Sequence, residues 1–334
     1  MFVDSHAHLD AHYYSLPVDA VIERAFDAGV SQMMVVGCGL EASRNAVELA
    51  RSHPGRIFAV AGVHPHDAGS ATEDEIEALG RLARSPEVVG IGETGLDYHY
   101  DRSPRKRQRE VFERFLDISR EVDKPVVIHT REAEKDTFEI LRRAAALPAS
   151  GVFHCFTGST ELARFAVDQG MFVSFSGVLT FKNAERLRRC ARDLPLDRLL
   201  IETDCPFMAP SPYRGLKNEP MLVSSVAGTL AAEKGLPLTE IAEITSRAAR
   251  TVFRLPRAPE HTILAFAVGA DLFVTVDDPS IAPERVLGAA GRFPSKKIKR
   301  VVLFRGNDAE PSETVAGAVR EWAALRRKPV VDPS

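Results

Sequence analysis

The chain alternates short apolar runs with helix-type patterns, and this alternation limits its fold more than any other feature. Eight runs with strand character begin near residues 2, 32, 57, 88, 125, 151, 171 and 199, and a helical pattern follows nearly every one. Strictly alternating strands and helices pair the strands in parallel through right-handed crossovers. Eight such units in about 250 residues predict a closed (β/α)₈ TIM barrel, an α/β fold. An open doubly wound sheet is the alternative, but no Gly-rich dinucleotide-binding motif follows the first strand.

The alternation stops near residue 255, and the remaining residues have a pattern of their own. They contain a strand candidate (262–276), a short helix (283–290), a second strand (298–304) and a second helix (312–327). We therefore expect a barrel over residues 1–255 and a small C-terminal α/β extension with βαβα order over residues 256–334. The pattern does not indicate what the extension does, and nothing in the chain indicates an oligomeric state.

Composition and charge limit the partners and the location of the protein. A net charge of −3 over 334 residues gives no general attraction for a polyanion, so nucleic acid would have to be bound locally or through metal ions. No apolar run reaches the roughly 20 residues that a membrane span needs, and no secretory signal is apparent at the start. The four cysteines have no CxxC spacing. We expect a cytoplasmic protein with no membrane partner.

Ligand-type side chains stand at the ends of five strand-like runs. They are His6, His8, Glu93, His129, His154 and Asp204. Residues two apart on a strand share a face, and the carboxyl ends of all barrel strands meet at one mouth. A single histidine at a strand end is usually an ordinary polar residue with a hydrogen-bond partner, but six such residues together favour a metal site. Four imidazoles and two carboxylates suit two divalent cations that share a carboxylate.

Six motifs in this order resemble the TatD-type metal-dependent deoxyribonucleases, a family of amidohydrolase-like metallohydrolases. The motifs are DSHAHL (4–9), GVHPH (62–66), GETGLDY (92–98), HTREA (129–133), HCFTG (154–158) and ETDCP (202–206), and RG (214–215) and NEP (218–220) match as well. The resemblance covers roughly residues 1–255. It implies a metal-dependent hydrolase that cleaves DNA, single-stranded or at 3′ ends, with 3′→5′ exonuclease polarity; RNA is left open as a substrate.

The resemblance also implies roles for the ligand-type residues. His6, His8 and Asp204 would hold a first metal, His129 and His154 a second, and Glu93 would bridge the two. The chemistry agrees, because a carboxylate has two oxygens for two cations and Asp204 can also accept a proton from the attacking water. We expect Asp204 and Glu93 to be the catalytic residues. The residue types suit Zn²⁺ or Mn²⁺, whereas Mg²⁺ prefers more oxygen ligands, so the metal is left open.

Further polar residues around the predicted mouth are candidates for substrate binding. His64 and His66 can donate to a phosphate oxygen, although one of them can instead close its loop. Arg131 can contact phosphate with two parallel hydrogen bonds, or form a surface ion pair. We expect Asp97 to orient a loop or a ligand histidine, and Glu202 either to support the ligands or to be buried and paired.

Two alternatives change the function but not the fold. The first is an amidohydrolase or esterase acting on a small molecule; many relatives in this superfamily bridge their metals with a lysine after the fourth strand, but residues 85–100 contain no lysine. The second is a nucleic-acid- or partner-binding protein that acts through the extension, whose residues 292–300 carry a basic run. A solvated surface is the simpler interpretation of that run. Tyr213 and Ser246 depart from the residues common in the family, which leaves the substrate preference open.

Overall fold

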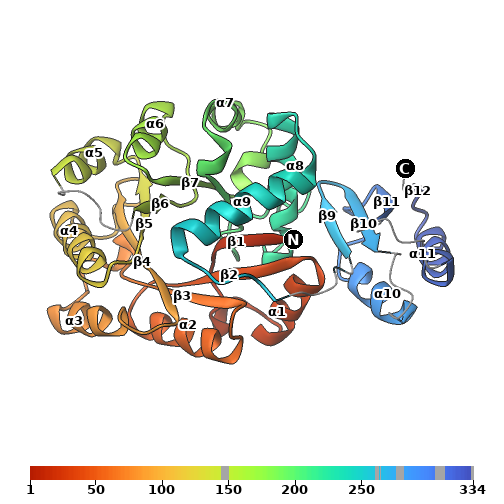
Figure 1. Ribbon diagram of the computed structural model, residues 1–334, viewed down its shortest axis with the longest axis horizontal. Helices are drawn as coiled ribbons and strands as arrows, with labels where there is room; N and C mark the ends of the chain where they lie inside the picture. The colour runs from red at the N-terminus through yellow and green to blue at the C-terminus, as the bar shows by residue number, and fades with distance from the viewer. Residues whose placement is uncertain (144–149, 260–262, 264, 276–281, 305–312, 332–334) are drawn as a thin grey trace.

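Eight parallel strands pair in chain order to form the larger of two sheets in the computed structural model (Figure 1). The structure describes residues 1–143, 150–259, 263, 265–275, 282–304 and 313–331. The strands of this sheet are β1 (Phe2–Ala7), β2 (Val30–Gly37), β3 (Ile57–Ala61), β4 (Val88–Asp97), β5 (Val126–Arg131), β6 (Gly151–Phe153), β7 (Phe172–Phe175) and β8 (Leu199–Ile201). The helices between and after them are α1 (Val18–Asp27), α2 (Leu40–Ser52), α3 (Glu73–Leu82), α4 (Arg105–Val122), α5 (Glu134–Arg143), α6 (Thr160–Asp168), α7 (Glu185–Asp193), α8 (Val223–Lys234) and α9 (Leu238–Phe253).

The predicted TIM barrel is confirmed, and local sequence signals account for many element boundaries. Thr72 accepts a hydrogen bond from the Glu75 N–H while the Glu75 side chain accepts one from the Thr72 N–H, a capping box that starts α3. β4 is longer than its apolar run of residues 88–91, because it continues through buried polar and glycine residues as far as Asp97. That continuation carries Glu93, so the polar end of β4 belongs to the sheet and not to a loop.

Hydrogen bonds between the first and the last strand bring the two ends of the sheet together. Ala7 forms an isolated parallel bridge with Cys205, and the Asp204 N–H donates to the His6 carbonyl over 3.0 Å. Beneath these bonds the buried Asp4 carboxylate accepts from the Thr203 N–H (2.9 Å) and hydroxyl (2.6 Å). The barrel is therefore nearly closed, and the ends of β1 and β8 are held side by side.

Helix α9 covers one end of the barrel. Its residues Ala248, Val252 and Phe253 pack in one apolar cluster with inward-facing residues at or near the strand starts, such as Val3. A Cβ on Gly90 would lie 3.2 Å from the Phe253 ring, so the small residue at this position makes room for that ring. In Figure 1 α9 crosses the front of the barrel. The amino ends of the strands are covered mainly by apolar packing, with a few buried polar side chains such as Gln32 and Ser246 bonded to backbone carbonyls.

The extension contains a second sheet with strand order β12-β11-β10-β9, and its order along the chain is ββαβαβ, which differs from the predicted βαβα in its first strand and in a short added last strand. Its described elements are β9 (Ala265–Val268), β10 (Asp271–Thr275), α10 (Pro283–Gly291), β11 (Arg300–Phe304), α11 (Glu313–Leu325) and β12 (Val330–Val331). The single strand predicted over 262–276 is an antiparallel hairpin that turns at Gly269, whose φ is +58°. Apolar residues on both sides of this short turn conceal it in the sequence. Predicted positions 262, 264, 276 and 312 lie outside the described residues.

The extension packs against α1, α8 and the start of β1. The Ser224 and Ser225 hydroxyls at the start of α8 donate to the Ala267 carbonyl, and the Phe2 and Phe266 rings lie 6.1 Å apart. Arg292 forms an ion pair with Asp27 at the end of α1. Within the described ranges, none of the helices combines the length and apolarity required to cross a bilayer.

We expect Phe253→Ala to lower the free energy of unfolding by about 3–5 kcal/mol, because it removes a large buried ring from the closed end of the barrel. Urea unfolding measures the change. Arg247→Ala on the exposed face of the same helix is the matched control and should stay within about 0.5 kcal/mol of the unsubstituted protein. Equal effects of the two substitutions would contradict the role given to α9.

Candidate metal centre

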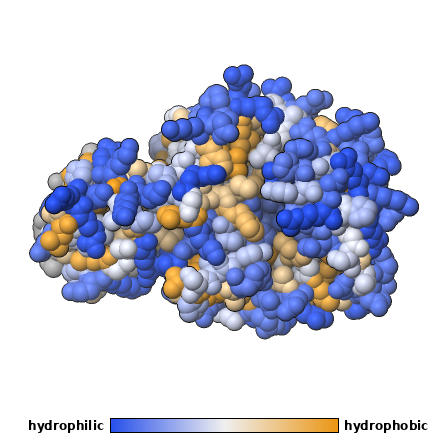
Figure 2. All heavy atoms as spheres, turned by 180° about the vertical axis from the view of Figure 1, so that it is seen from behind, coloured by the Kyte–Doolittle hydropathy of each residue, from blue (hydrophilic) through white to orange (hydrophobic). Residues whose placement is uncertain are grey.

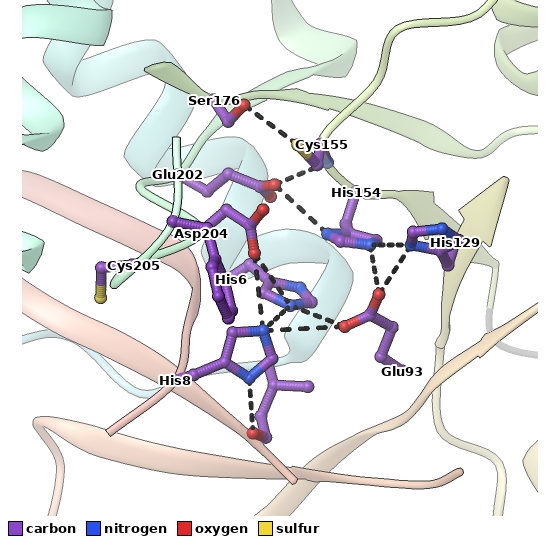
Figure 3. Close-up of polar contacts among 12 residues, drawn as sticks. His6, His8, Glu93, His129, His154, Cys155, Ser176, Glu202, Asp204 and Cys205 are labelled. Atoms are coloured by element: carbon purple, nitrogen blue, oxygen red, sulfur yellow. Dashed lines mark hydrogen bonds and ion pairs between the residues drawn. The ribbon is translucent and has the colours of Figure 1, made fainter. Parts of the chain in front are cut away.

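The structure brings the six ligand-type residues together at the carboxyl ends of the strands. His6 lies in β1 and His8 just beyond it, Glu93 lies in β4, His129 in β5, and His154 and Asp204 directly follow β6 and β8. Figure 3 shows their side chains pointing toward one another. Five of the six are less than 9% exposed, and His129 is the more accessible one. The convergence follows from the barrel, because parallel strands deliver their last residues to one rim.

The Glu93 carboxylate lies at the middle of the cluster and faces imidazoles on both sides. Its Oε2 atom is 3.2 Å from His6 Nε2 and 3.8 Å from His8 Nε2. Its Oε1 atom is 2.8 Å from both His129 Nδ1 and His154 Nε2. Each oxygen therefore faces its own group of histidines.

Asp204 lies on the His6 and His8 side of Glu93. Its Oδ1 atom is 3.5 Å from His8 Nε2 and 3.9 Å from His6 Nε2. The backbone bond from the Asp204 N–H to the His6 carbonyl, which also helps to close the barrel, fixes this position. The same contact between β1 and β8 thus serves both the fold and the site.

The sequence predicts that His64 contacts the substrate, but its side chain lies against the Glu93 carboxylate within the ligand cluster. Its Nε2 atom is 3.3 Å from Glu93 Oε1, and His64, Glu93 and His129 form one group whose potential ligand atoms lie within 4.8 Å of one another. The sequence does not single out His64 as a ligand, because it follows the end of β3 by three residues and is interpreted there as part of a loop. A metal-ligand role for His64 is therefore a possibility that only the structure raises.

The other two predicted substrate-binding residues lie farther out at the mouth. His66 Nε2 is 3.0 Å from Asp97 Oδ2. The Arg131 guanidinium lies 4.8 Å from the centre of the Tyr100 ring, and the described part of the chain contains no ion pair for it. Arg131 is therefore not occupied by a surface ion pair there, and its charge faces an aromatic ring at the rim.

Carboxylates behind the cluster hold two of its imidazoles. Asp97 Oδ2 is 3.2 Å from His129 Nε2, and Glu202 Oε1 is 3.4 Å from His154 Nδ1 and accepts from the Cys155 N–H over 2.6 Å. Contacts of this kind fix the ring orientation and the tautomer of a ligand histidine. Both arrangements agree with the alternatives that the sequence left open for Asp97 and Glu202.

One further side chain at the centre has no counterpart among the residues selected from the sequence. Cys38 Sγ is 3.8 Å from His8 Nδ1 and 4.0 Å from Glu93 Oε2. Cys38 follows the end of β2, so the rule that strand ends meet at the mouth already points to it. The other thiol at the site, Cys155, lies 3.1 Å from the Ser176 hydroxyl.

Close approach of β3, β4 and β5 requires glycine at particular places. A Cβ on Gly62 would lie 2.5 Å from the Gly92 Cα, and one on Gly95 would lie 2.0 Å from the His129 carbonyl oxygen. Side chains at these positions would push the strands apart. The glycines on both sides of Glu93 therefore set its distance to the histidines of the neighbouring strands.

The carboxyl groups of the cluster are ionised, and the groups around them favour positive charge. Burial alone would raise the pKa of the Glu93 carboxyl, but His154, His64 and His129 hold it well below its ordinary value. Burial would also raise the pKa of the Asp204 carboxyl, but the contact with His8 outweighs burial, so this pKa is lowered. Burial would lower the pKa of His154, yet Glu93 and Glu202 raise it well above its usual range. The cluster therefore keeps its carboxylates charged and ready to bind a cation.

The donor set fits a divalent cation. His6 Nε2 and His8 Nε2 lie 3.3 Å apart and face each other, so at most one of them can donate to the other. His6, His8 and Glu93 offer ligand atoms within 4.8 Å of one another, as do His6, His154 and Glu202. Imidazole nitrogens combined with carboxylate oxygens are suitable ligands for Zn²⁺ and Mn²⁺. Histidine and glutamate groups that can bind metal are thus present, on a barrel whose opposite end is closed.

This fold and this site define the class of metal-dependent hydrolases built on a TIM barrel, and comparison with known proteins agrees. The family model described as "TatD related DNase" matches residues 3–254. The chain is 42% identical over 255 residues to the uncharacterized metal-dependent hydrolase YabD of Bacillus subtilis, covering 76% of this chain and 100% of that protein. The crystal structure of YjjV, a TatD homologue from Escherichia coli K12, has a TM-score of 0.72 at 30% identity and covers 76% and 98% of the two chains.

A relative from Erwinia tasmaniensis is named a 3′-5′ ssDNA/RNA exonuclease, TatD. It is 35% identical over 242 residues, which is 71% of this chain and 93% of that protein. Together with the match of the family model, these similarities show that the chain belongs to the TatD family of metal-dependent hydrolases.

We expect Zn²⁺ or Mn²⁺ to raise the thermal midpoint of metal-free protein, because an ion bound only by the folded state stabilises it by about 2.7 kcal/mol at 100 times its Kd. Glu93→Gln should lose most of this rise, since Glu93 contacts both groups of histidines. Differential scanning fluorimetry measures the shift. His53→Gln, at the far end of α2, is the matched control and should keep it. An undiminished rise in Glu93→Gln would place metal binding elsewhere.

Proposed function

We propose that the chain is a divalent-metal-dependent phosphodiesterase that cleaves DNA, single-stranded or at 3′ ends, as a 3′→5′ exonuclease. The observation that carries the proposal is the buried Glu93 carboxylate between two groups of imidazoles, with Asp204 beside the first group. Membership of the TatD family and the printed activity of the Erwinia tasmaniensis relative support the choice of nucleic acid as substrate. RNA is a second substrate class within the same proposal.

We assign two cations to the cluster. His6, His8 and Asp204 would hold the first and His129 and His154 the second, with Glu93 shared between them and His64 as a further donor to the second. When bound, such ions polarise a phosphoryl oxygen and lower the pKa of water. The imidazole-rich donor set favours Zn²⁺ or Mn²⁺ over Mg²⁺.

Asp204 is the proposed general base. It is ionised at neutral pH, because His8 and the other imidazoles lower its pKa, and it lies at the open end of the barrel. In the proposed reaction the oxygen of a water molecule bonds to phosphorus and its proton passes to an Asp204 carboxylate oxygen. The bond from phosphorus to the leaving sugar oxygen breaks in the same displacement.

Residues at the rim would hold the phosphate in place for this attack. Arg131 has a guanidinium that is not paired with a described carboxylate, and it can donate two parallel hydrogen bonds to phosphate oxygens. His66, whose ring packs on the same Tyr100 ring as Arg131, is held by Asp97. We also propose that residues 256–334 form a separate unit, which agrees with the end of the family match at residue 254 and with the second sheet.

We expect Asp204→Asn to slow the shortening of labelled single-stranded DNA at least about 100-fold in the presence of Mn²⁺ or Mg²⁺, because general bases contribute roughly 10²–10⁴-fold to rates. Gel analysis of a 5′-labelled oligonucleotide measures both the rate and the direction of cleavage. Asp197→Asn, exposed before the other end of β8, is the matched control and should cleave at the normal rate.

Two results would count against the proposed function, one against DNA cleavage itself and one against its direction. One is a purified, metal-loaded protein that leaves DNA intact but hydrolyses small amides or esters, which would favour the amidohydrolase alternative. The other is release of the 5′ label as a mononucleotide without a ladder of shorter labelled strands, which would contradict the 3′→5′ direction while leaving the phosphodiesterase in place.

A further inference from the structure

A pocket of about 350 Å³ lies at the same end of the barrel as the candidate metal centre, and no role has been assigned to it. We call it the rim pocket; it is lined by Phe181, Lys182, Asn183, Ser211 and Arg214. The first three residues follow the short helical turn Gly177–Thr180 after β7, and the other two belong to the long loop between β8 and α8. Both segments leave carboxyl ends of strands, so the pocket opens on the same end of the barrel as the metal centre.

Hydrogen bonds connect one lining segment to the metal centre and the two lining segments to each other. The Phe207 N–H, in the β8–α8 loop, donates to the Asp204 carbonyl over 3.0 Å. The Ser211 N–H donates to the Thr180 hydroxyl over 2.8 Å, which joins the two segments to each other. Ser211 stands seven positions after Asp204, and a fully extended chain of that length spans at most about 25 Å. A short strand of nucleic acid can therefore reach from the metal centre to the rim pocket.

The rim pocket carries positive charge without acidic neighbours in its lining. Lys182 and Arg214 are exposed, and within the described part of the chain neither takes part in an ion pair. Nearby arginines differ: Arg186 donates to the carbonyls of Thr157 and Gly158, and Arg188 is held by Glu185. The two cations of the pocket are thus left to bind an anion from outside.

Aromatic surface adjoins these charges. The Arg214 guanidinium lies 4.0 Å from the centre of the Phe181 ring. In the β8–α8 loop, which contributes to the pocket, Phe207 is 47% exposed and its ring lies 6.0 Å from that of His8. Figure 2, seen from the side opposite α9, shows an apolar strip between hydrophilic ridges on this end of the molecule. Exposed rings beside cations are the means by which proteins hold single strands, with bases stacked and phosphates paired.

We propose that the rim pocket binds a backbone phosphate of single-stranded nucleic acid, through Lys182 and Arg214, while an unpaired base of the same strand stacks on Phe207. The inference rests on the proposed function and specifies how the substrate is held beyond the scissile bond. A paired base could not stack on Phe207, because its faces are already covered in a duplex. The pocket thus makes binding depend on strand length and on single-strandedness.

Salt dependence of binding tests the phosphate contacts without requiring catalysis. Each phosphate of a single strand that pairs with a protein cation contributes about −0.7 to the slope of log Kobs against log [salt]. Because both cations pair with one phosphate, we expect Lys182→Ala to make the slope shallower and Lys182→Ala/Arg214→Ala to make it shallower by about 0.7 in all. Arg214→Lys keeps the charge and should keep the slope. Fluorescence anisotropy of a labelled ten-nucleotide strand, measured in EDTA, gives the values, and thermal unfolding confirms that each variant is folded.

Lys296→Ala is the matched control, because it removes one exposed lysine from the basic run of the extension. We expect Lys296→Ala to leave the slope unchanged. We expect Lys182→Ala to raise the KM for the same DNA several-fold, and these two results together support the proposal. Equal slopes for Lys182→Ala and the unsubstituted protein would overturn the rim-pocket proposal. A shallower slope in Lys296→Ala alone would place DNA binding on the extension. If the unsubstituted protein cleaves DNA while Lys182→Ala changes nothing, only this inference fails; if it neither binds nor cleaves DNA, the proposed function fails as well.

Discussion

The Glu93 carboxylate is buried among imidazoles that come from β1, β3, β5 and β6, and the rest of the molecule is arranged so that these distances are kept. An ionised carboxylate away from water is costly unless opposite charge or donors surround it closely. Glu93 meets that condition only while the strands that carry His6 and His129 stay where they are. The glycines at 92 and 95 let β5 approach β4, and the contacts of Asp4 with Thr203 hold the first strand against the last.

The two ends of the barrel have different roles: the amino ends are packed for stability, and the carboxyl ends carry the residues for chemistry. Apolar side chains near the strand starts pack under α9, where they stabilise the barrel. The carboxyl ends gather buried polar side chains that would be unfavourable in such a core, and each is held by another, as Asp97 holds His129 and Glu202 holds His154. Because stabilising packing lies at one end, the other end can be devoted to binding a cation and a substrate.

The extension has a structural connection with the rim of the barrel. It packs on α1 and α8, and Asp271 in β10 lies close enough to Tyr213 to add to the effect of burial in raising the pKa of that phenol. Tyr213 is fully buried and immediately precedes Arg214, one of the two cations of the rim pocket. The extension therefore packs around the loop that carries this part of the proposed substrate path, a relation that its sequence pattern does not reveal.

The sequence by itself determined the barrel and the identity of the clustered residues, because both depend on local regularities. Alternating apolar runs specify parallel strands, and strand ends in such a barrel must meet, so His6, Glu93 and Asp204 could be grouped although they lie far apart in the chain. Only the tertiary structure decided that β4 continues through Glu93, that His64 and Cys38 touch the cluster, that α9 closes the barrel and that residues 265–275 form a hairpin. The physical reason is that these features are set by distances between segments remote in sequence, and a pattern read along one segment contains no information on such distances.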